Sequence, residues 1–301
     1  QTLAVRFQTN GTYYTALSAS FMEPWLTGKK PMSLSASVYF TRQTNSYYYY
    51  LNDDEYMEVF GVAASLGSRL KWPDDYFVLY HELSWQQYKL KDWNYNFLFA
   101  NGKSNNLSSK LTLNRNSTDQ PIYPRSGSDF TFGVQLTPPY SLFRSDDTDY
   151  KNMTDQERYK WIEYHKWTFK SALYTKVFGD FVLKTAADFG YLGYYNKDLG
   201  YSPFEGFQLG GDGMSGYNTY GSDIIGLRGY PNYSLTPIMG NAYAGRVYDK
   251  FTVELRYPVV LQPQSTIYAL AFLEGGNCWS DIKDFNPFEI KRSVGVGLRV
   301  M

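Results

Sequence analysis

The sequence is poor in the residues that build disulfides and metal sites. It contains one cysteine, Cys278, so an intrachain disulfide is excluded and a cysteine-based metal site cannot be assembled. The two histidines, His81 and His165, lie far apart in the sequence, and neither belongs to a motif with the spacing of zinc ligands. We therefore expect no metal ion and assign all three side chains a structural role.

The chain also lacks a net charge and long apolar runs. Its 29 basic residues balance 29 acidic residues, and no basic patch interleaved with aromatics stands out, so no nucleic-acid partner is expected. No segment approaches the roughly 20 apolar residues of a membrane-spanning helix. The opening residues, QTLAVRFQT, are typical of a strand and not of a signal or transit peptide.

Motifs of covalent chemistry are missing as well. The sequence shows no nucleophile–base constellation, no phosphate loop and no metal cluster, which predicts a protein that is not an enzyme. The glycine pairs at 210–211 and 275–276 lie outside any strand–GxGxxG–helix unit, so no nucleotide or other cofactor is expected.

What the chain has in abundance is tyrosine, 30 residues of 301, and a two-residue alternation of apolar and polar side chains. The alternation is clearest in 33–41, 250–257 and 293–300 and predicts strands with two distinct faces. Twelve strands are expected, near 2–9, 12–22, 32–43, 57–70, 76–90, 105–116, 129–138, 164–178, 181–194, 246–258, 265–275 and 290–301.

Two all-β architectures share this alternation, and the connections distinguish them. A soluble sandwich buries its apolar face, whereas a transmembrane barrel turns that face to lipid and fills its interior with polar side chains. Long connections (44–56, 91–104, 139–163, 195–245) alternate with short ones such as 71–75 and 261–265, and aromatics gather near strand ends, as in NSYYYYLND, FMEPWL and YHKW. These features favour the antiparallel transmembrane barrel.

The barrel interpretation assigns each strand residue to a face. The residues expected to face lipid are Leu34, Val38, Val253, Leu255, Val294 and Val296, and those expected to face the interior are Ser33, Ser35, Glu254 and Gly295.

Two long connections have features of their own. In 139–163, Thr154 followed by Glu157 is a capping box that predicts a short helix. The connection 195–245 is uncommonly long and cannot be read as regular structure, yet it is too aromatic and too weakly charged for a disordered segment. We expect it to fold back into the barrel, where Arg228 would need carboxylate partners, and Glu254 and Glu274 are the inward-facing acids on the strands that follow.

The order of several motifs resembles that of the BamA family, the outer-membrane insertases of the barrel-assembly machinery and their superfamily. The motifs are LGG at 209–211, LRGY at 227–230, VELRYPV at 253–259, FLEGGNCW at 272–279, KRSVGVGLRV at 291–300, and YPRSGSDF at 123–130, which resembles a Pro-x-x-Gly turn of the family. The resemblance covers essentially the whole chain. It implies a barrel of the sixteen-strand type whose sixth extracellular loop folds into the lumen.

The resemblance also implies which residues of that loop bind the inner face of the barrel. Arg228, Gly229 and Tyr230 correspond to the family's Arg-Gly-Phe/Tyr motif, and Glu254 and Glu274 stand where its acidic partners belong. Gly210 and Gly211 belong to the same functional loop through the LGG motif.

By the same resemblance, residues 1–301 form part of an outer-membrane barrel domain, with about twelve strands and without the periplasmic POTRA domains that precede family barrels. The implied function is the folding and insertion of outer-membrane proteins in a Gram-negative outer membrane. The implied partners are unfolded outer-membrane proteins as clients, envelope lipoproteins or other machinery subunits, and the lipid bilayer. A polypeptide transporter of two-partner secretion remains the alternative, and a passive porin is disfavoured by the internal arginine loop.

Overall fold

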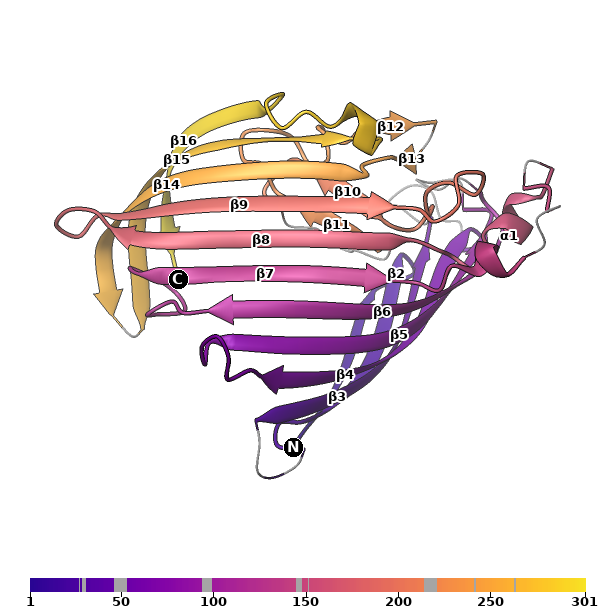
Figure 1. The fold of residues 1–301 in the computed structure, drawn as a ribbon, viewed down its shortest axis with the longest axis horizontal. Helices are drawn as coiled ribbons and strands as arrows, with labels where there is room; N and C mark the ends of the chain where they lie inside the picture. Colours follow the sequence, from indigo (N-terminus) through magenta and orange to yellow (C-terminus); the bar gives the residue numbers. More distant parts are fainter. Residues whose placement is uncertain are drawn as a thin grey trace.

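One large antiparallel sheet organises the molecule. The computed structural model describes residues 1–26, 28, 31–45, 53–93, 99–144, 148–150, 152–213, 221–240, 242–262 and 264–301. In these residues, twelve strands follow each other around the sheet in chain order, except that β14 follows β9 because four short strands lie in the connection between them (Figure 1). The twelve are β1 (Thr2–Asn10), β2 (Tyr14–Glu23), β3 (Met32–Thr44), β4 (Tyr56–Arg69), β5 (Phe77–Lys91), β6 (Gly102–Asn116), β7 (Gly127–Leu136), β8 (His165–Lys176), β9 (Val182–Gly193), β14 (Val247–Gln262), β15 (Ser265–Trp279) and β16 (Lys291–Val300).

All twelve strands predicted from the sequence are present, and most boundaries lie within one or two residues of the expected ones. The largest differences are in the hairpin of β14 and β15, whose strands continue past the expected ends at 258 and 275 to Gln262 and Trp279. The extension beyond Glu274 runs through Gly275 and Gly276, where the apolar–polar alternation stops, so periodicity could not predict it.

The sheet has its polar face inside and its apolar face outside. In β14, the side chains of Thr252, Glu254 and Arg256 are buried, whereas those of Val253 and Tyr257 are exposed. A soluble core would reverse this distribution, because it removes apolar surface from water. The strands therefore have the character of a lipid-facing barrel wall.

The predicted facing follows the same rule in the other strands. Of the residues expected to face outward, Val38, Val294 and Val296 are exposed, and Leu34 and Leu255 are half-buried. Of those expected to face inward, Glu254 of β14 is almost completely buried, and Ser33, Ser35 and Gly295 are half-buried.

Connections differ in length at the two ends of the sheet. The connections 45–55, 92–101, 137–164, 194–246 and 280–290 lie at what we call the long-loop end, together with one short turn, 11–13. The connections 24–31, 70–76, 117–126, 177–181 and 263–264 lie at the short-turn end. The tyrosines at 47–50, expected in an aromatic girdle, lie outside the described residues.

The connection between β9 and β14, which we call the plug loop (194–246), fills part of the concave side of the sheet. It was expected to lack regular structure, and this expectation was wrong. It contains the parallel pair β10 (Gly206–Leu209) and β11 (Ser222–Ile225), and the antiparallel pair β12 (Ile238–Met239) and β13 (Ala242–Tyr243). These strands have two to four residues each, which is too short for a periodic pattern to reveal.

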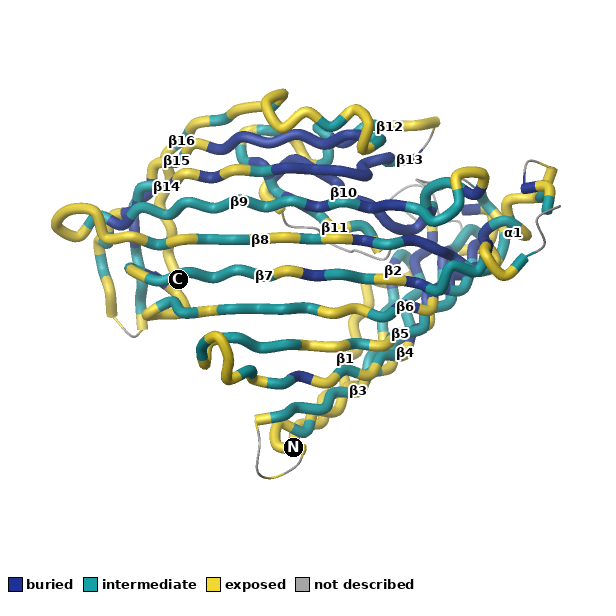
Figure 2. The backbone as a smooth tube through the Cα atoms, viewed as in Figure 1, coloured by how far each residue is buried: buried dark blue, intermediate teal, exposed yellow. Residues whose placement is uncertain are grey.

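The main hydrophobic core lies between the plug loop and the inner wall near the long-loop end. Phe204, Phe207 and Leu227 of the loop pack in one cluster with Tyr88 of β5 and Tyr248 of β14. Figure 2 shows the buried segments gathered around this region of the sheet and loop. Each buried side chain of this size contributes about 1.5–3 kcal/mol relative to an exposed one, so the apolar residues hold the loop inside.

Helices are few and short in the described part of the chain. The predicted capping box is present: Thr154 accepts a hydrogen bond from the backbone of Glu157 and begins α1 (Asp155–Arg158). A 3-10 turn, η1 (Tyr140–Phe143), lies in the same connection as α1, and a second, η2 (Ile282–Asp284), lies in the connection 280–290. None of the helices that the structure describes is long and apolar enough to cross a membrane.

Candidate functional site

The candidate site is formed where the plug loop meets the inner face of β14 and β15. Thr252 and Glu254 of β14 are two residues apart and therefore point to the same face of the sheet. The antiparallel register places Thr252 opposite Glu274 of β15 and Glu254 opposite Phe272. Two carboxylates, one hydroxyl and one aromatic ring are thereby presented to the concave side of the sheet on adjacent strands.

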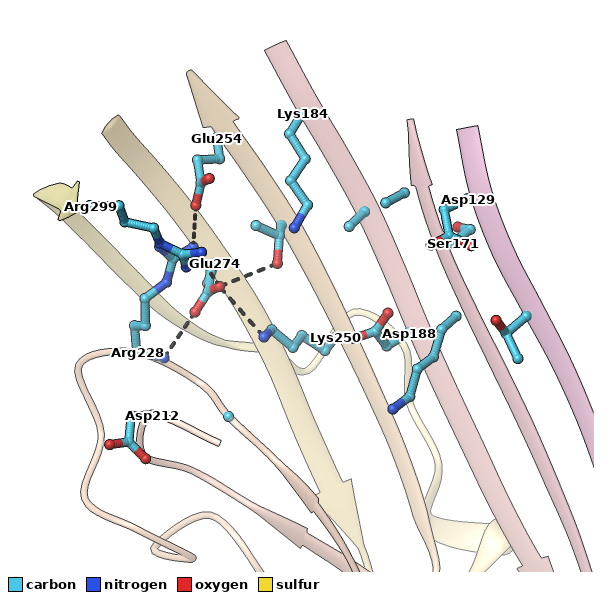
Figure 3. A pocket seen from close by; sticks show the side chains of 16 residues that line it. Asp129, Ser171, Lys184, Asp188, Asp212, Arg228, Lys250, Glu254, Glu274 and Arg299 are labelled. Atoms are coloured by element: carbon cyan, nitrogen blue, oxygen red, sulfur yellow. Dashed lines mark hydrogen bonds and ion pairs between the residues drawn. The ribbon is translucent and has the colours of Figure 1, made fainter. Parts of the chain in front are cut away.

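Arg228 of the plug loop binds both carboxylates. Its Nη2 lies 2.9 Å from Glu254 Oε2 and 2.8 Å from Glu274 Oε1, and the two glutamate side chains are 1% and 3% exposed. The backbone N–H of Arg228 also donates to Glu274 Oε2 at 2.9 Å, so this carboxylate holds the residue by main chain and side chain (Figure 3). Charge-assisted hydrogen bonds of this kind are about twice as strong as neutral ones.

The guanidinium of Arg228 has an aromatic support as well. Its Cζ lies 3.7 Å from the centroid of the Phe272 ring, a cation–π geometry. Burial by itself lowers the pKa of Arg228, but the hydrogen bonds and charges of Glu274 and Glu254 outweigh it, and the pKa lies above its ordinary value. The residue is therefore charged whenever the loop is docked.

Further cations share the two carboxylates. Lys250 Nζ lies 3.5 Å from Glu274 Oε1, and Arg256 Nε lies 2.6 Å from Glu254 Oε1. Thr252 Oγ1 donates to Glu274 at 3.3 Å. Each buried carboxylate thus has a second cation besides Arg228, which offsets the cost of taking it out of water.

The neighbours of Arg228 in the motif fix the path of the loop. Gly229 has a φ of 89°, a left-handed conformation that disfavours any residue with a Cβ, and a Cβ there would lie 3.2 Å from Ser293 Cβ. The hydroxyl of Tyr230 donates to the backbone carbonyl of Arg292 at 3.0 Å. The motif therefore contacts three consecutive strands, β14, β15 and β16.

Gly210 and Gly211 lie in the plug loop, next to the segment that carries Arg228. Gly211 forms an antiparallel bridge with Leu227, and the backbone N–H of Gly210 donates to Ile225 at 3.0 Å. Both glycines have positive φ, and a Cβ at Gly210 would lie 2.5 Å from the carbonyl oxygen of Pro231. The two glycines let the segment after β10 pass close to the segment that carries Arg228.

Comparison with known proteins assigns the chain to a family. A model described as the Omp85 superfamily domain matches residues 1–301. The chain belongs to the Omp85 superfamily. No curated protein sequence matches it.

The Omp85 chain also resembles a solved structure, that of BamA from Haemophilus ducreyi lacking POTRA domains 1–3. The TM-score is 0.66 at 16% sequence identity, and the match covers 98% of this chain and 57% of the BamA chain. The likeness shows a shared fold, and the chain spans less than two thirds of the length of that structure.

A second anchor of the Omp85 plug loop lies on β8, away from the arginine motif. Lys166 Nζ is 3.0 Å from Glu205 Oε2 and 3.3 Å from Asp223 Oδ2, and it donates to the carbonyl of Gly221 at 3.2 Å. The hydroxyl of Tyr164 donates to Glu205 Oε1 at 3.1 Å. Burial raises the pKa of the Glu205 carboxyl above its ordinary value, while the adjacent Lys166 charge acts in the opposite direction.

Sequence reasoning assigned no role to Lys166, Glu205, Arg256 or Phe272. The signal for Arg256 was present, because it lies two residues from Glu254 on the inward phase of β14. No comparable signal exists for the pair of Lys166 and Glu205, since their contact depends on how the plug loop folds. In the described residues, no group of three or more histidine, cysteine, aspartate or glutamate side chains has a geometry that could hold a metal ion.

Proposed function

We propose that the chain is the barrel of an outer-membrane insertase that folds and inserts β-barrel proteins in a Gram-negative outer membrane. The observation that supports this proposal is the Arg228 motif, bound through Glu254 and Glu274 to β14 and β15 and through Tyr230 to β16. Membership of the Omp85 superfamily supports a barrel of the insertase and transporter type.

The proposed work is physical and involves no covalent chemistry. An unfolded client adds its strands to a sheet edge of the barrel, where main-chain hydrogen bonds provide the affinity and the lipid-facing pattern selects the register. The docked plug loop holds β14, β15 and β16 in a fixed relation through charge-assisted bonds. In this mechanism the loop stiffens the wall against which clients assemble.

The proposed partners follow from the same mechanism. Unfolded outer-membrane proteins are the clients, and the lipid bilayer surrounds the apolar outer face of the sheet. Envelope lipoproteins or other machinery subunits bind the loops and turns. The connection 139–163 is the preferred outer contact, because it combines charged and aromatic residues beside α1. Glu163 joins the two ends of this connection, because its carboxylate accepts from the backbone N–H and the hydroxyl of Ser141 at 2.7 and 2.6 Å.

Depletion of the protein in cells tests the proposal. Loss of an insertase lowers the amount of heat-modifiable, folded β-barrel proteins in the outer membrane, and a plasmid copy of the gene restores them. A transporter of the two-partner secretion type would instead lose one secreted polypeptide while other barrels assemble normally. Normal levels of all barrels after depletion would exclude the insertase function.

A further inference from the structure

The connection between β15 and β16 (280–290), which we call the outer flap, folds back over the sheet instead of extending from its end. The ring of Phe285 lies 5.8 Å from the ring of Phe189 on β9 and 5.0 Å from the ring of Trp279 on β15. In the sheet, β14 lies between β9 and β15. The side chain of Phe285 therefore crosses the end of β14.

The strand residues beneath the outer flap belong to the outer face of the sheet. Asp249 precedes Val253 by four residues on β14 and therefore points to the same face, and Val253 is exposed there. The register places Asp249 opposite Phe189 of β9 and opposite Asn277 of β15. Directly opposite residues share a face, and Trp279 follows Asn277 by two residues. The rings that contact Phe285 are thus on the outer face.

The burial of Asp249 shows how closely this part of the wall is covered. Asp249 is 2% exposed, although Phe251 and Val253 on the same face of β14 are each 44% exposed. Its Oδ1 accepts from the backbone N–H of Asn277 at 3.0 Å, and Asn277 Nδ2 donates to the carbonyl of Glu289 in the outer flap at 2.8 Å. A carboxylate against hydrocarbon is costly. The outer flap therefore separates Asp249 from lipid.

The outer flap exposes apolar side chains of its own. Phe288 is 86% exposed and Ile282 is 39% exposed. Phe288 belongs to an ordered turn, because its backbone N–H donates to Asn286 Oδ1 at 3.2 Å. On the outer face of the two strands that the flap connects, Leu273 and Val294 are also exposed. The flap thus continues the apolar surface of the wall.

The position and the charge of this surface indicate what covers it. The wall that the outer flap continues has the character of a lipid-facing surface. Aromatic side chains are favoured at the boundary between lipid headgroups and acyl chains. The charges of residues 281–292 balance, so no net charge attracts an acidic or a basic partner: Asp281, Asp284 and Glu289 stand against Lys283, Lys291 and Arg292. A bilayer leaflet is therefore the partner that fits this surface.

We propose that the outer flap is a membrane-binding element that covers Asp249 on the wall and inserts Phe288 into the bilayer leaflet at the long-loop end. Where the flap lies on β9, β14 and β15, the lipid contact moves from the wall to the flap. This role depends on the position of the barrel in a membrane and not on insertase activity.

A spin label at position 288 measures the depth of the flap in the bilayer. Full-length protein with Phe288→Cys is labelled with a nitroxide and reconstituted into phosphatidylcholine vesicles. Cys278 is buried, so the label attaches to the introduced cysteine, and the unsubstituted protein reports the background. The collision rates of the label with oxygen, which concentrates among acyl chains, and with a water-soluble nickel chelate on both sides of the membrane give its depth. Position 288 should lie about 5–10 Å into the boundary between headgroups and acyl chains.

Two further labelled positions calibrate this result. Leu273→Cys on the outer face of β15 should be accessible to oxygen, and Lys197→Cys, which is exposed in the plug loop, should be accessible to the nickel chelate. Phe288→Cys should resemble Leu273→Cys. A label at 288 that resembles Lys197→Cys, or one that neither reagent reaches, would overturn the membrane contact.

Hydrogen exchange in residues 281–290 tests whether the flap is docked on the wall. Phe285→Ala should make this segment exchange about tenfold faster, because it removes the ring contacts with Phe189 and Trp279. Phe285→Leu keeps apolar bulk and should show a smaller increase, whereas Asp284→Ala, which removes an exposed carboxylate from the same segment, should show none. Unchanged exchange in Phe285→Ala would overturn the docked position of the flap.

Discussion

Removing the guanidinium of Arg228 is the sharpest perturbation of the site. Arg228→Ala deletes the contacts to Glu254 and Glu274 and the stacking on Phe272. The two carboxylates stay buried, since their side chains are 1% and 3% exposed. The variant therefore leaves desolvated negative charge behind instead of returning it to water.

The magnitude follows from what remains around the carboxylates. Removing one partner of a buried ion pair costs about 3–5 kcal/mol. Arg256 still neutralises Glu254, and Lys250 still lies near Glu274, so the lower bound of about 3 kcal/mol is appropriate. A loss of about 3 kcal/mol makes the fraction of molecules in which the segment of Arg228 is undocked from β14 and β15 roughly a hundredfold larger than in the wild type.

Hydrogen exchange measures this fraction directly, because amide protons exchange from the opened state. Residues 224–230 should exchange roughly a hundredfold faster in Arg228→Ala than in the wild type. Arg228→Lys should show an intermediate increase, because an ammonium cannot reproduce the planar fork. Lys197→Ala, which removes an exposed cation from the same loop, is the matched control and should not change the exchange. Unchanged exchange in Arg228→Ala would refute the reasoning that the ion pairs hold the loop.

Three further substitutions test the backbone conformation at Gly229, the Lys166 anchor and the connection 137–164. Gly229→Ala should lower the stability of the folded barrel by about 1–2 kcal/mol, measured as an earlier loss of the heat-modifiable form, because its φ is left-handed and Ser293 is close. Lys166→Met should destabilise the protein by about 3–5 kcal/mol, and the double variant Lys166→Met/Glu205→Leu should be less affected because no buried charge is left unpaired. Equal stability of the single and double variants would contradict the second anchor. Glu163→Ala should make the connection 137–164 cleave faster in limited proteolysis without changing exchange in 224–230; protection equal to the wild type would show that this carboxylate does not hold the connection.

Features that depend on neighbouring residues in the sequence could be predicted, and contacts between distant residues mostly could not. The alternation in 250–257 predicts β14 and its two faces, because facing in a strand depends only on the parity of the residue number. The contact of Arg228 with Glu254 and Glu274 followed from a family resemblance and from the need of a buried guanidinium for carboxylates, and the structure places these atoms within 3 Å. What these residues do for client assembly stays a prediction.

The parts that could not be predicted depend on long-range folding of short segments. β10 and β11 are paired with each other across residues 210–221, and their four-residue length gives no periodic signal. The burial of Tyr123 requires knowledge of the curvature that brings the turn at 117–126 to β15. Neither the composition of that turn nor its two prolines, Pro121 and Pro124, indicate on which side of the sheet its side chains will lie.

The rate at which a client barrel folds into liposomes measures the proposed insertase function directly. A urea-denatured outer-membrane β-barrel protein is diluted into liposomes that contain the full-length protein, and its folded, heat-modifiable form is followed with time. The client should fold faster than in empty liposomes. The Arg228→Ala protein should accelerate its folding less than the wild type does, and the Lys197→Ala protein should accelerate it as much. A client folding rate that is the same with the wild-type protein as in empty liposomes would contradict the proposed insertase function.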